Sequence, residues 1–295
     1  MLKEQCMKSK FGNVLLLTMM VALLTACAGP GKKSVRTGAK SSFKVVKKHH
    51  SAIAQSPMPA TNPSSLFPPR ILEPGKRTTQ DVLYQFGPYA EEQLKPYFQE
   101  AGVAYPPREV VFIALKQEKK LEVWARDGGE FRFIRDYEIK AASGVTGPKL
   151  RQGDKQVPEG VYRIVGLNPN SNYHLSMKLN YPNEFDRFHA RREGRFDPGS
   201  DIFIHGDSVS AGCLAMGNKA IEELFVLTAQ VGEENVKVIV APRDPRVLPL
   251  DPNGYGLPSW TPELYRTIAA EMAVFSEKVR VSNNRALYPA RSPLR

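Results

Sequence analysis

Hydrophobic and polar positions change period along the chain, and short strand-like segments dominate its middle. Apolar, β-branched or alternating runs occur at 110–115, 121–124, 131–134, 139–143, 161–165, 201–204 and 236–240. Runs of this length, separated by glycine- and proline-containing turns, are typical of β-strands. Asp127-Gly128-Gly129 is a turn sequence that joins the second and third runs. The pattern predicts a mainly β, mostly antiparallel domain over residues 108–242.

Segments with helical periodicity flank these strands. Residues 80–102 have a helical pattern that Gly87-Pro88 interrupts and Gly102 ends, which predicts two helical pieces within 76–107. Asn218 is a candidate N-cap for a helix over 219–231, with Gly232 after its end. A final amphipathic helix is expected over 262–279, within a proline-rich and helical C-terminal segment, 243–295.

The N-terminus has the pattern of an export signal. Three lysines precede an apolar run, 14–24, that is too short to cross a bilayer. Residues 1–26 are therefore predicted to be a signal peptide. It ends in Leu24-Thr25-Ala26-Cys27, which resembles the bacterial lipobox, and this resemblance implies a lipoprotein signal and lipidation of Cys27. An ordinary signal peptide and an uncleaved anchor are the alternatives.

The basic residues are unevenly distributed. The 295-residue chain has a formal net charge of +11, but residues 27–72 hold eight basic residues and no acidic one. Residues 73–295 hold 30 basic and 29 acidic residues, so this part is close to neutral and no nucleic-acid partner is expected. Lysine, serine, proline and glycine dominate residues 27–75, which predicts a disordered basic tether.

Cysteine use draws attention to Cys213. The chain has three cysteines. Cys6 would be removed with the signal peptide and Cys27 would be lipidated, which leaves Cys213 as a free thiol. An unpaired thiol in an oxidising envelope is a liability unless its reactivity is used. A buried structural cysteine is the alternative.

The residues around Cys213 favour nucleophilic catalysis. His205 ends a buried run eight residues before Cys213 and is the candidate proton acceptor and donor. We expect this imidazole and the following helix entry to lower the pKa of the thiol. Gly206 and Gly212 would allow close backbone approach, with amides near Gly212 directed at an oxyanion, and Ser210 would orient the imidazole or bind substrate. Together they predict acyl transfer through a thioester.

Metal chemistry is not expected. The predicted domain contains only His174, His189 and His205, without ligand spacing of the His-Glu-x-x-His kind. His174 and His189 are interpreted as structural or substrate-contacting. No metal and no cofactor are predicted.

The motif resembles a family. His-Gly followed by Ser-x-Gly-Cys and an apolar residue is similar to the signature of YkuD-type L,D-transpeptidases, bacterial cell-wall enzymes with a largely β catalytic domain. The likeness covers about residues 108–242. Further segments resemble the YafK-like branch of this family: 142–144, 156–162, 167–171, 174–176 and 212–217. The resemblance implies that Cys213 is the nucleophile and that His205 transfers protons.

The resemblance also implies a substrate and a location. It implies that a peptidoglycan stem peptide is acylated onto Cys213 at its diamino acid and passed to an amine of a neighbouring stem or of a wall-linked lipoprotein. With the lipobox, it implies a lipid-anchored, periplasm-facing protein of the bacterial cell envelope, with Ala28 favouring the outer membrane. A hydrolase or amidase of the same family is the first alternative. A non-catalytic wall-binding module is the second.

Two departures from the family pattern affect substrate binding. The interval between His-Gly and the cysteine is short, and Ala215 stands where most members have an arginine that holds a substrate carboxylate. The basic segment with Arg187, Arg191 and Arg192 is the candidate replacement, because arginine binds carboxylates in a bidentate manner. A solvated loop is the alternative. Gly206 and His174 complete the predicted substrate-binding set.

Overall fold

The computed structural model describes residues 75–275, which form a mixed nine-stranded sheet with helices on both faces. The predicted signal peptide, Cys27, nearly all of the tether and residues 276–295 lie outside the described part. The sheet order is β3-β2-β1-β9-β5-β6-β7-β8-β4. The strands are β1 (Glu109–Leu115), β2 (Lys120–Arg126), β3 (Arg132–Glu138), β4 (Ala141–Ala142), β5 (Gly160–Ser171), β6 (His174–Leu179), β7 (Phe203–His205), β8 (Leu214–Ala215) and β9 (Val236–Ala241).

The mainly β prediction is confirmed, with a refinement in strand direction. Most neighbouring strands are antiparallel, but β1 pairs in parallel with β9, and β7 pairs in parallel with β8. Strand β6 and the C-terminal half of β5 were not predicted from the sequence. These two strands form a long hairpin whose register shifts at bulges.

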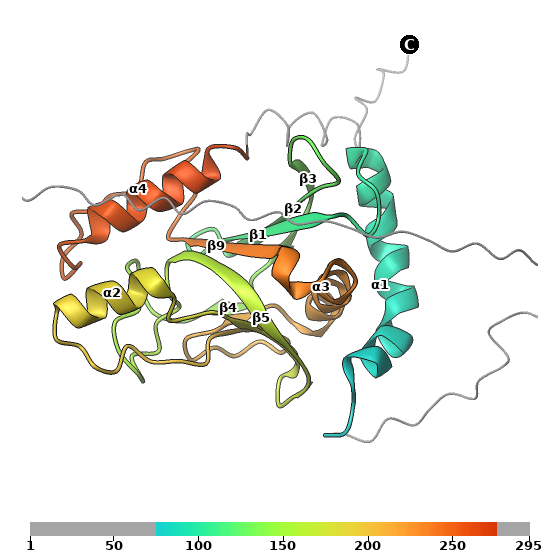
Figure 1. Ribbon diagram of the computed structural model, residues 1–295, viewed down its shortest axis with the longest axis horizontal. Helices are drawn as coiled ribbons and strands as arrows, with labels where there is room; N and C mark the ends of the chain where they lie inside the picture. The colour runs from blue at the N-terminus through green and yellow to red at the C-terminus, as the bar shows by residue number, and fades with distance from the viewer. Residues whose placement is uncertain (1–74, 276–295) are drawn as a thin grey trace, which may run out of the picture. The chain divides into compact units, whose positions relative to one another are not determined.

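Two hydrophobic cores lie on opposite faces of the sheet. Strand β1 shows this directly, because alternate residues enter different cores. One core packs against α1 (Thr79–Ala101) and α3 (Asn218–Val231). The other packs against α4 (Thr261–Met272) and includes Phe185 of α2 (Glu184–Arg192) at its border. Figure 1 shows α1 and α3 together on one side and α2 and α4 on the other.

Helix α1 corrects the prediction of two pieces. It runs without a break from Thr79 to Ala101, with Pro88 and Pro96 inside it. Its buried residues, Val82, Ala90, Leu94 and Phe98, form one face against the core, so tertiary packing outweighs the local cost of proline. The helix starts at a capping box between Thr78 and Asp81 and ends at Gly102, which has a left-handed conformation.

Two other helices differ from their predicted bounds. Helix α3 begins at Asn218 itself, and the Asn218 side chain makes no cap hydrogen bond to the helix. Its Oδ1 accepts instead from the backbone N–H of Asp207 at 2.8 Å, which ties the helix start to the turn after β7. Helix α4 ends at Met272, so the described part of the expected 262–279 helix is shorter. No helix in residues 75–275 is long and apolar enough to cross a membrane.

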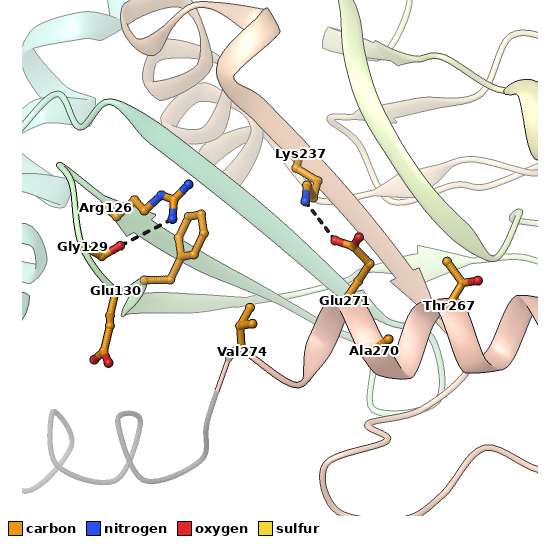
Figure 2. A pocket seen from close by; sticks show the side chains of 9 residues that line it. Arg126, Gly129, Glu130, Lys237, Thr267, Ala270, Glu271 and Val274 are labelled. Atoms are coloured by element: carbon orange, nitrogen blue, oxygen red, sulfur yellow. Dashed lines mark hydrogen bonds and ion pairs between the residues drawn. The ribbon is translucent and has the colours of Figure 1, made fainter.

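A large surface hollow lies away from the His205–Cys213 motif. It has a volume of about 850 Å³ between the β2–β3 hairpin, β9 and α4. Figure 2 shows Lys237 and Glu271 paired across one of its walls, with their charged atoms 2.9 Å apart. Neither His205 nor Cys213 lines this hollow.

Candidate active site

His205 and Cys213 lie on two neighbouring strands, at opposite ends of the short parallel pair that β7 forms with β8. His205 is the last residue of β7, and Cys213 immediately precedes β8. Because these strands pair in parallel, the chain must return through the turn 206–213 between them. Both side chains line a pocket of about 170 Å³. Its other lining residues are Asn168, Ser171, Asn172, Tyr173, Ser176 and Phe203.

The imidazole of His205 is buried and oriented. It is only 2% exposed, and its Nδ1 lies 2.6 Å from the carbonyl oxygen of Gly206. Because a carbonyl oxygen can only accept, this contact places the proton on Nδ1 and leaves a lone pair on Nε2. Burial lowers the pKa of His205 below its usual value, opposed by the Gly206 hydrogen bond and the charge of Asp207. The ring is therefore suited to accept a proton at Nε2 at neutral pH.

The thiol of Cys213 has a different electrostatic balance from the one predicted. Burial raises its pKa, while a hydrogen bond from the Phe203 backbone and the charge of Lys149 oppose this rise. The Sγ atom lies 3.8 Å from the Asp201 carbonyl oxygen. The prediction that the surroundings lower the thiol pKa is therefore wrong for the free protein, because burial outweighs the favourable contacts. Proton transfer to a base must accompany attack by this thiol.

Ser210 and Gly212 shape the turn that carries the thiol. The Ser210 hydroxyl donates to the Cys213 carbonyl at 2.7 Å and does not orient the imidazole. The Gly212 amide donates to the hydroxyl of Ser143 at 2.7 Å, so in the free protein it is directed at Ser143. Gly212 has a φ of +114°, a conformation that favours glycine. Both residues therefore stabilise the turn that carries Cys213.

Gly206 allows the closest backbone approach at the site. A Cβ atom at this position would lie 2.6 Å from the Tyr173 carbonyl oxygen and 2.8 Å from Asn218 Oδ1. Neither distance is compatible with a side chain without movement of the turn. Gly206 therefore brings together the end of β7, the β5–β6 hairpin and the start of α3.

His174 and His189 lie outside the pocket. His174 Nε2 is 2.6 Å from Glu222 Oε1 of α3, and the His174 ring meets Phe86 edge-on. His189 is buried and stacks on Trp260, with their ring centroids 4.6 Å apart. Among residues 75–275, no group of three His, Cys, Asp or Glu side chains could hold a metal ion.

The basic segment forms helix α2, away from the thiol pocket. Arg187 donates to the Pro182 carbonyl, and the Arg192 guanidinium lies 5.5 Å from the Phe188 ring centre. Arg191 is on the same helix. None of the three lines the pocket of Cys213, so the structure does not bring them to the thiol. Ala215 is buried in β8 and supplies no polar group.

Several residues of the site were missed by reasoning from single motifs. Ser143 supports the turn, and Asn168, Ser171 and Tyr173 line the pocket. They come from segments that are distant from Cys213 in sequence and reach it only through the sheet. The family-like segments 142–144, 167–171 and 174–176 lie at or beside these positions and were the available signal.

Comparison with known proteins relates residues 108–240 to a known family. Residues 108–240 match the family model for the L,D-transpeptidase catalytic domain, named YkuD. The domain is also 39% identical over 132 residues to the Escherichia coli K12 protein named "Putative L,D-transpeptidase YafK", a match that covers 43% of this chain and 51% of the relative. The chain thus spans about half the length of this curated relative.

Two solved structures are similar to part of this chain. One is the helical cell shape determining protein Pgp2 from Campylobacter jejuni, with 21% identity, a TM-score of 0.39, and coverage of 52% of this chain and 56% of that one. Another is L,D-transpeptidase 1 from Mycobacterium tuberculosis, with 12% identity, a TM-score of 0.26, and coverage of 45% and 62%.

Proposed function

We propose that this protein is a cysteine acyltransferase that acts on peptidoglycan stem peptides. The observation that carries the proposal is the shared pocket of His205 and Cys213, with the imidazole Nδ1 engaged by the Gly206 carbonyl and Nε2 left to exchange protons. The match to the YkuD family model supports the substrate class.

The reaction begins with proton transfer from Cys213 Sγ to His205 Nε2. The sulfur attacks the carbonyl carbon of the stem peptide at its diamino acid, and the carbonyl oxygen gains negative charge. The Gly212 amide already donates its hydrogen bond to Ser143. We therefore assign the backbone N–H of Cys213 as the donor of a hydrogen bond to this oxyanion. The intermediate collapses to a thioester, and His205 returns its proton to the departing amine of the terminal residue.

A second molecule then resolves the thioester. In the transpeptidase, an amine of a neighbouring stem or a lipoprotein lysine attacks, and His205 accepts its proton. A new amide bond forms as the Cys213 thiolate departs and is reprotonated. The amine must reach the same small pocket from its open side.

Hydrolysis is the alternative outcome of the same thioester. Water would replace the amine, giving an amidase that cleaves links within the wall or between wall and lipoprotein. The observation that favours this alternative is the lack of an arginine among the residues that line the Cys213 pocket in the described part of the chain. Without this cation, the pocket has one fewer group to hold a substrate carboxylate.

We also propose that the protein is lipid-anchored through Cys27 and faces the periplasm from the bacterial envelope. The charged N-terminal region, the short apolar run and the Leu-Thr-Ala-Cys sequence support this location. The basic, proline-containing residues 27–75 would then connect the anchor to the catalytic domain.

The test uses the full chain in detergent beside its Cys213→Ala variant. Both are incubated with tetrapeptide muropeptides and with wall sacculi that carry bound protein, and the products are identified by mass spectrometry. Cross-linked or terminal-exchanged products that need Cys213 support the transpeptidase. Released protein or cleaved links without new bonds support the amidase. Activity that survives in Cys213→Ala would overturn both, and no product with an unreactive thiol would favour a binding module.

A further inference from the structure

The tip of the β5–β6 hairpin lies against the catalytic imidazole. The ring of Tyr173 is centred 4.6 Å from the ring of His205, with an angle of 37° between their planes. Tyr173 is 44% exposed, whereas His205 is 2% exposed. The tyrosine ring therefore forms part of the cover that separates the imidazole from solvent. The position of this tip sets how deeply His205 is buried.

Arg77 is hydrogen-bonded to the hairpin on both sides of Tyr173. Its backbone N–H donates to Asn170 Oδ1 at 2.9 Å, and its carbonyl accepts from Asn170 Nδ2 at 2.7 Å. Its guanidinium Nη2 donates to the His174 carbonyl at 2.9 Å. Asn170 and His174 flank the tip residues 171–173. One residue from before α1 thus fixes both ends of the tip.

The hairpin tip depends on contacts of this kind. His174 has a φ of +71°, a left-handed conformation that residues other than glycine seldom adopt. Its side chain is held by Glu222, and its carbonyl is held by Arg77. Neither support comes from the hairpin itself. We expect that removing either one loosens the backbone next to Tyr173.

We propose that Arg77 is a positioning residue for the proton-transfer step, which it serves by holding Tyr173 against His205. The inference rests on the proposed function only for the role of His205. Arg77 touches neither the thiol nor the pocket, because it acts through the hairpin backbone. A purely structural role for Arg77 would stabilise the fold without changing the behaviour of the imidazole.

The Arg77→Ala variant has an expected pH signature. Burial lowers the pKa of His205, so partial uncovering of the ring raises that pKa toward its ordinary value. A base with a higher pKa is protonated up to a higher pH. The acid side of the Cys213 reactivity profile therefore moves to higher pH, and the rate at pH 6 falls several-fold.

The experiment measures alkylation of Cys213 by iodoacetamide across pH, using the full chain in detergent. Mass spectrometry of the Cys213 peptide separates this thiol from other cysteines. The set comprises wild type, Arg77→Ala, Arg77→Lys, Tyr173→Ala and the Arg77/Tyr173 double alanine variant. Arg108→Ala is the matched control, because Arg108 is exposed and paired with Asp127 outside the site. No wall substrate is needed, so an error in the proposed substrate does not affect the result.

The proposal expects the same shift in Arg77→Ala and Tyr173→Ala and no further shift in the double variant, because both act on one contact. Arg77→Lys should retain part of the wild-type profile, and Arg108→Ala all of it. An Arg77→Ala protein that melts earlier but keeps the wild-type pH profile would overturn the proposal, as would additive shifts. If Arg77→Ala does not fold, Asn170→Ala removes two of the three bonds and provides the same comparison.

Discussion

The Gly212 amide donates to the Ser143 hydroxyl at 2.7 Å, and this bond joins two segments that are 69 residues apart. Ser143 also donates to the Lys155 carbonyl at 2.7 Å, and its hydroxyl lies 3.0 Å from that of Ser210. Ser210 in turn binds the carbonyl of Cys213. The turn that carries the thiol is therefore held by a network anchored outside it, in the loop between β4 and β5.

We expect Ser143→Ala to reduce kcat by about tenfold or more while the fold is retained. The change leaves the Gly212 amide without its acceptor and lets the turn move, and displacements of about 1 Å at a catalytic centre cost up to ~100-fold. Steady-state assays on the active substrate measure kcat and KM. Ser208→Ala is the matched control, because Ser208 is exposed in the same turn. Equal rates for the two variants would contradict a role for the Ser143 network.

The thiol of Cys213 should titrate above the ordinary cysteine value once its base is removed. Burial raises the pKa of this thiol, so His205→Gln should alkylate with a midpoint above about 8.5. Thiolate is then scarce at pH 7, and the rate there should be lower than for an exposed cysteine. The measurement is the iodoacetamide rate against pH for the Cys213 peptide.

The unfolded His205→Gln protein in urea is the control for this thiol. Its Cys213 should return to the ordinary midpoint, because unfolding removes the burial. A folded midpoint below that of the unfolded chain would mean that the nearby charge of Lys149 and the Phe203 backbone outweigh burial.

Removing one partner of a buried ion pair should lower stability strongly. Lys116 Nζ lies 2.9 Å from Glu159 Oε1, with the two side chains 7% and 0% exposed. Glu159 also accepts from the Gly147 amide and from the Tyr265 hydroxyl. Glu159→Gln leaves the Lys116 charge buried with only neutral hydrogen-bond partners and should lower the free energy of unfolding by about 3 kcal/mol. Urea denaturation followed by circular dichroism measures this loss.

An exposed pair provides the contrast for this test. Glu138 pairs with Lys140 at the surface, and Glu138→Gln should leave the free energy of unfolding nearly unchanged. The double variant Lys116→Met/Glu159→Gln should recover part of the loss, because it removes the stranded charge. If the double variant is less stable than Glu159→Gln, the further cost lies in the hydrogen bonds that Lys116 donates to the backbone carbonyls of Val145 and Val157.

Local sequence patterns predicted much of the sheet and indicated His205 and Cys213, which line one pocket. Alternation and β-branched runs indicated β1, β2 and β9, because each strand buries side chains that its own sequence displays. His205 and Cys213 were found from chemistry alone, since an unpaired thiol near a histidine and two glycines is a recognisable combination.

Tertiary packing decided what the sequence did not reveal. Pro88 remains inside α1 because one helix face is buried along its whole length. Asn218 is of a residue type that is common at helix caps, yet its side chain accepts a hydrogen bond from the Asp207 backbone across the turn. The support from Ser143 and Arg77 depends on pairings across 69 and more than 90 residues, which no local window contains. Burial likewise reversed the expected direction of the Cys213 pKa.

Asp186 should make stability depend on pH between about 4 and 6. Burial raises its pKa from 3.8 to about 6, while hydrogen bonds from Asn183 and Tyr162 oppose the rise. Below pH 3.8 the carboxyl is protonated in both folded and unfolded chains. As pH rises through this window, the unfolded chain ionises first, so the contribution of Asp186 to stability is lost and stays lost above about pH 6.

The Asp186→Asn variant isolates this contribution. Asparagine keeps an oxygen that can accept from the Asn183 amide at the start of α2 but cannot ionise. The difference in Tm between Asp186→Asn and wild type should therefore move in favour of the variant from pH 4 to pH 6.5. Asp251→Asn, at an exposed position, should show no such trend. A difference for Asp186→Asn that stays constant over this range would show that the carboxyl ionises equally readily in the folded and unfolded chains.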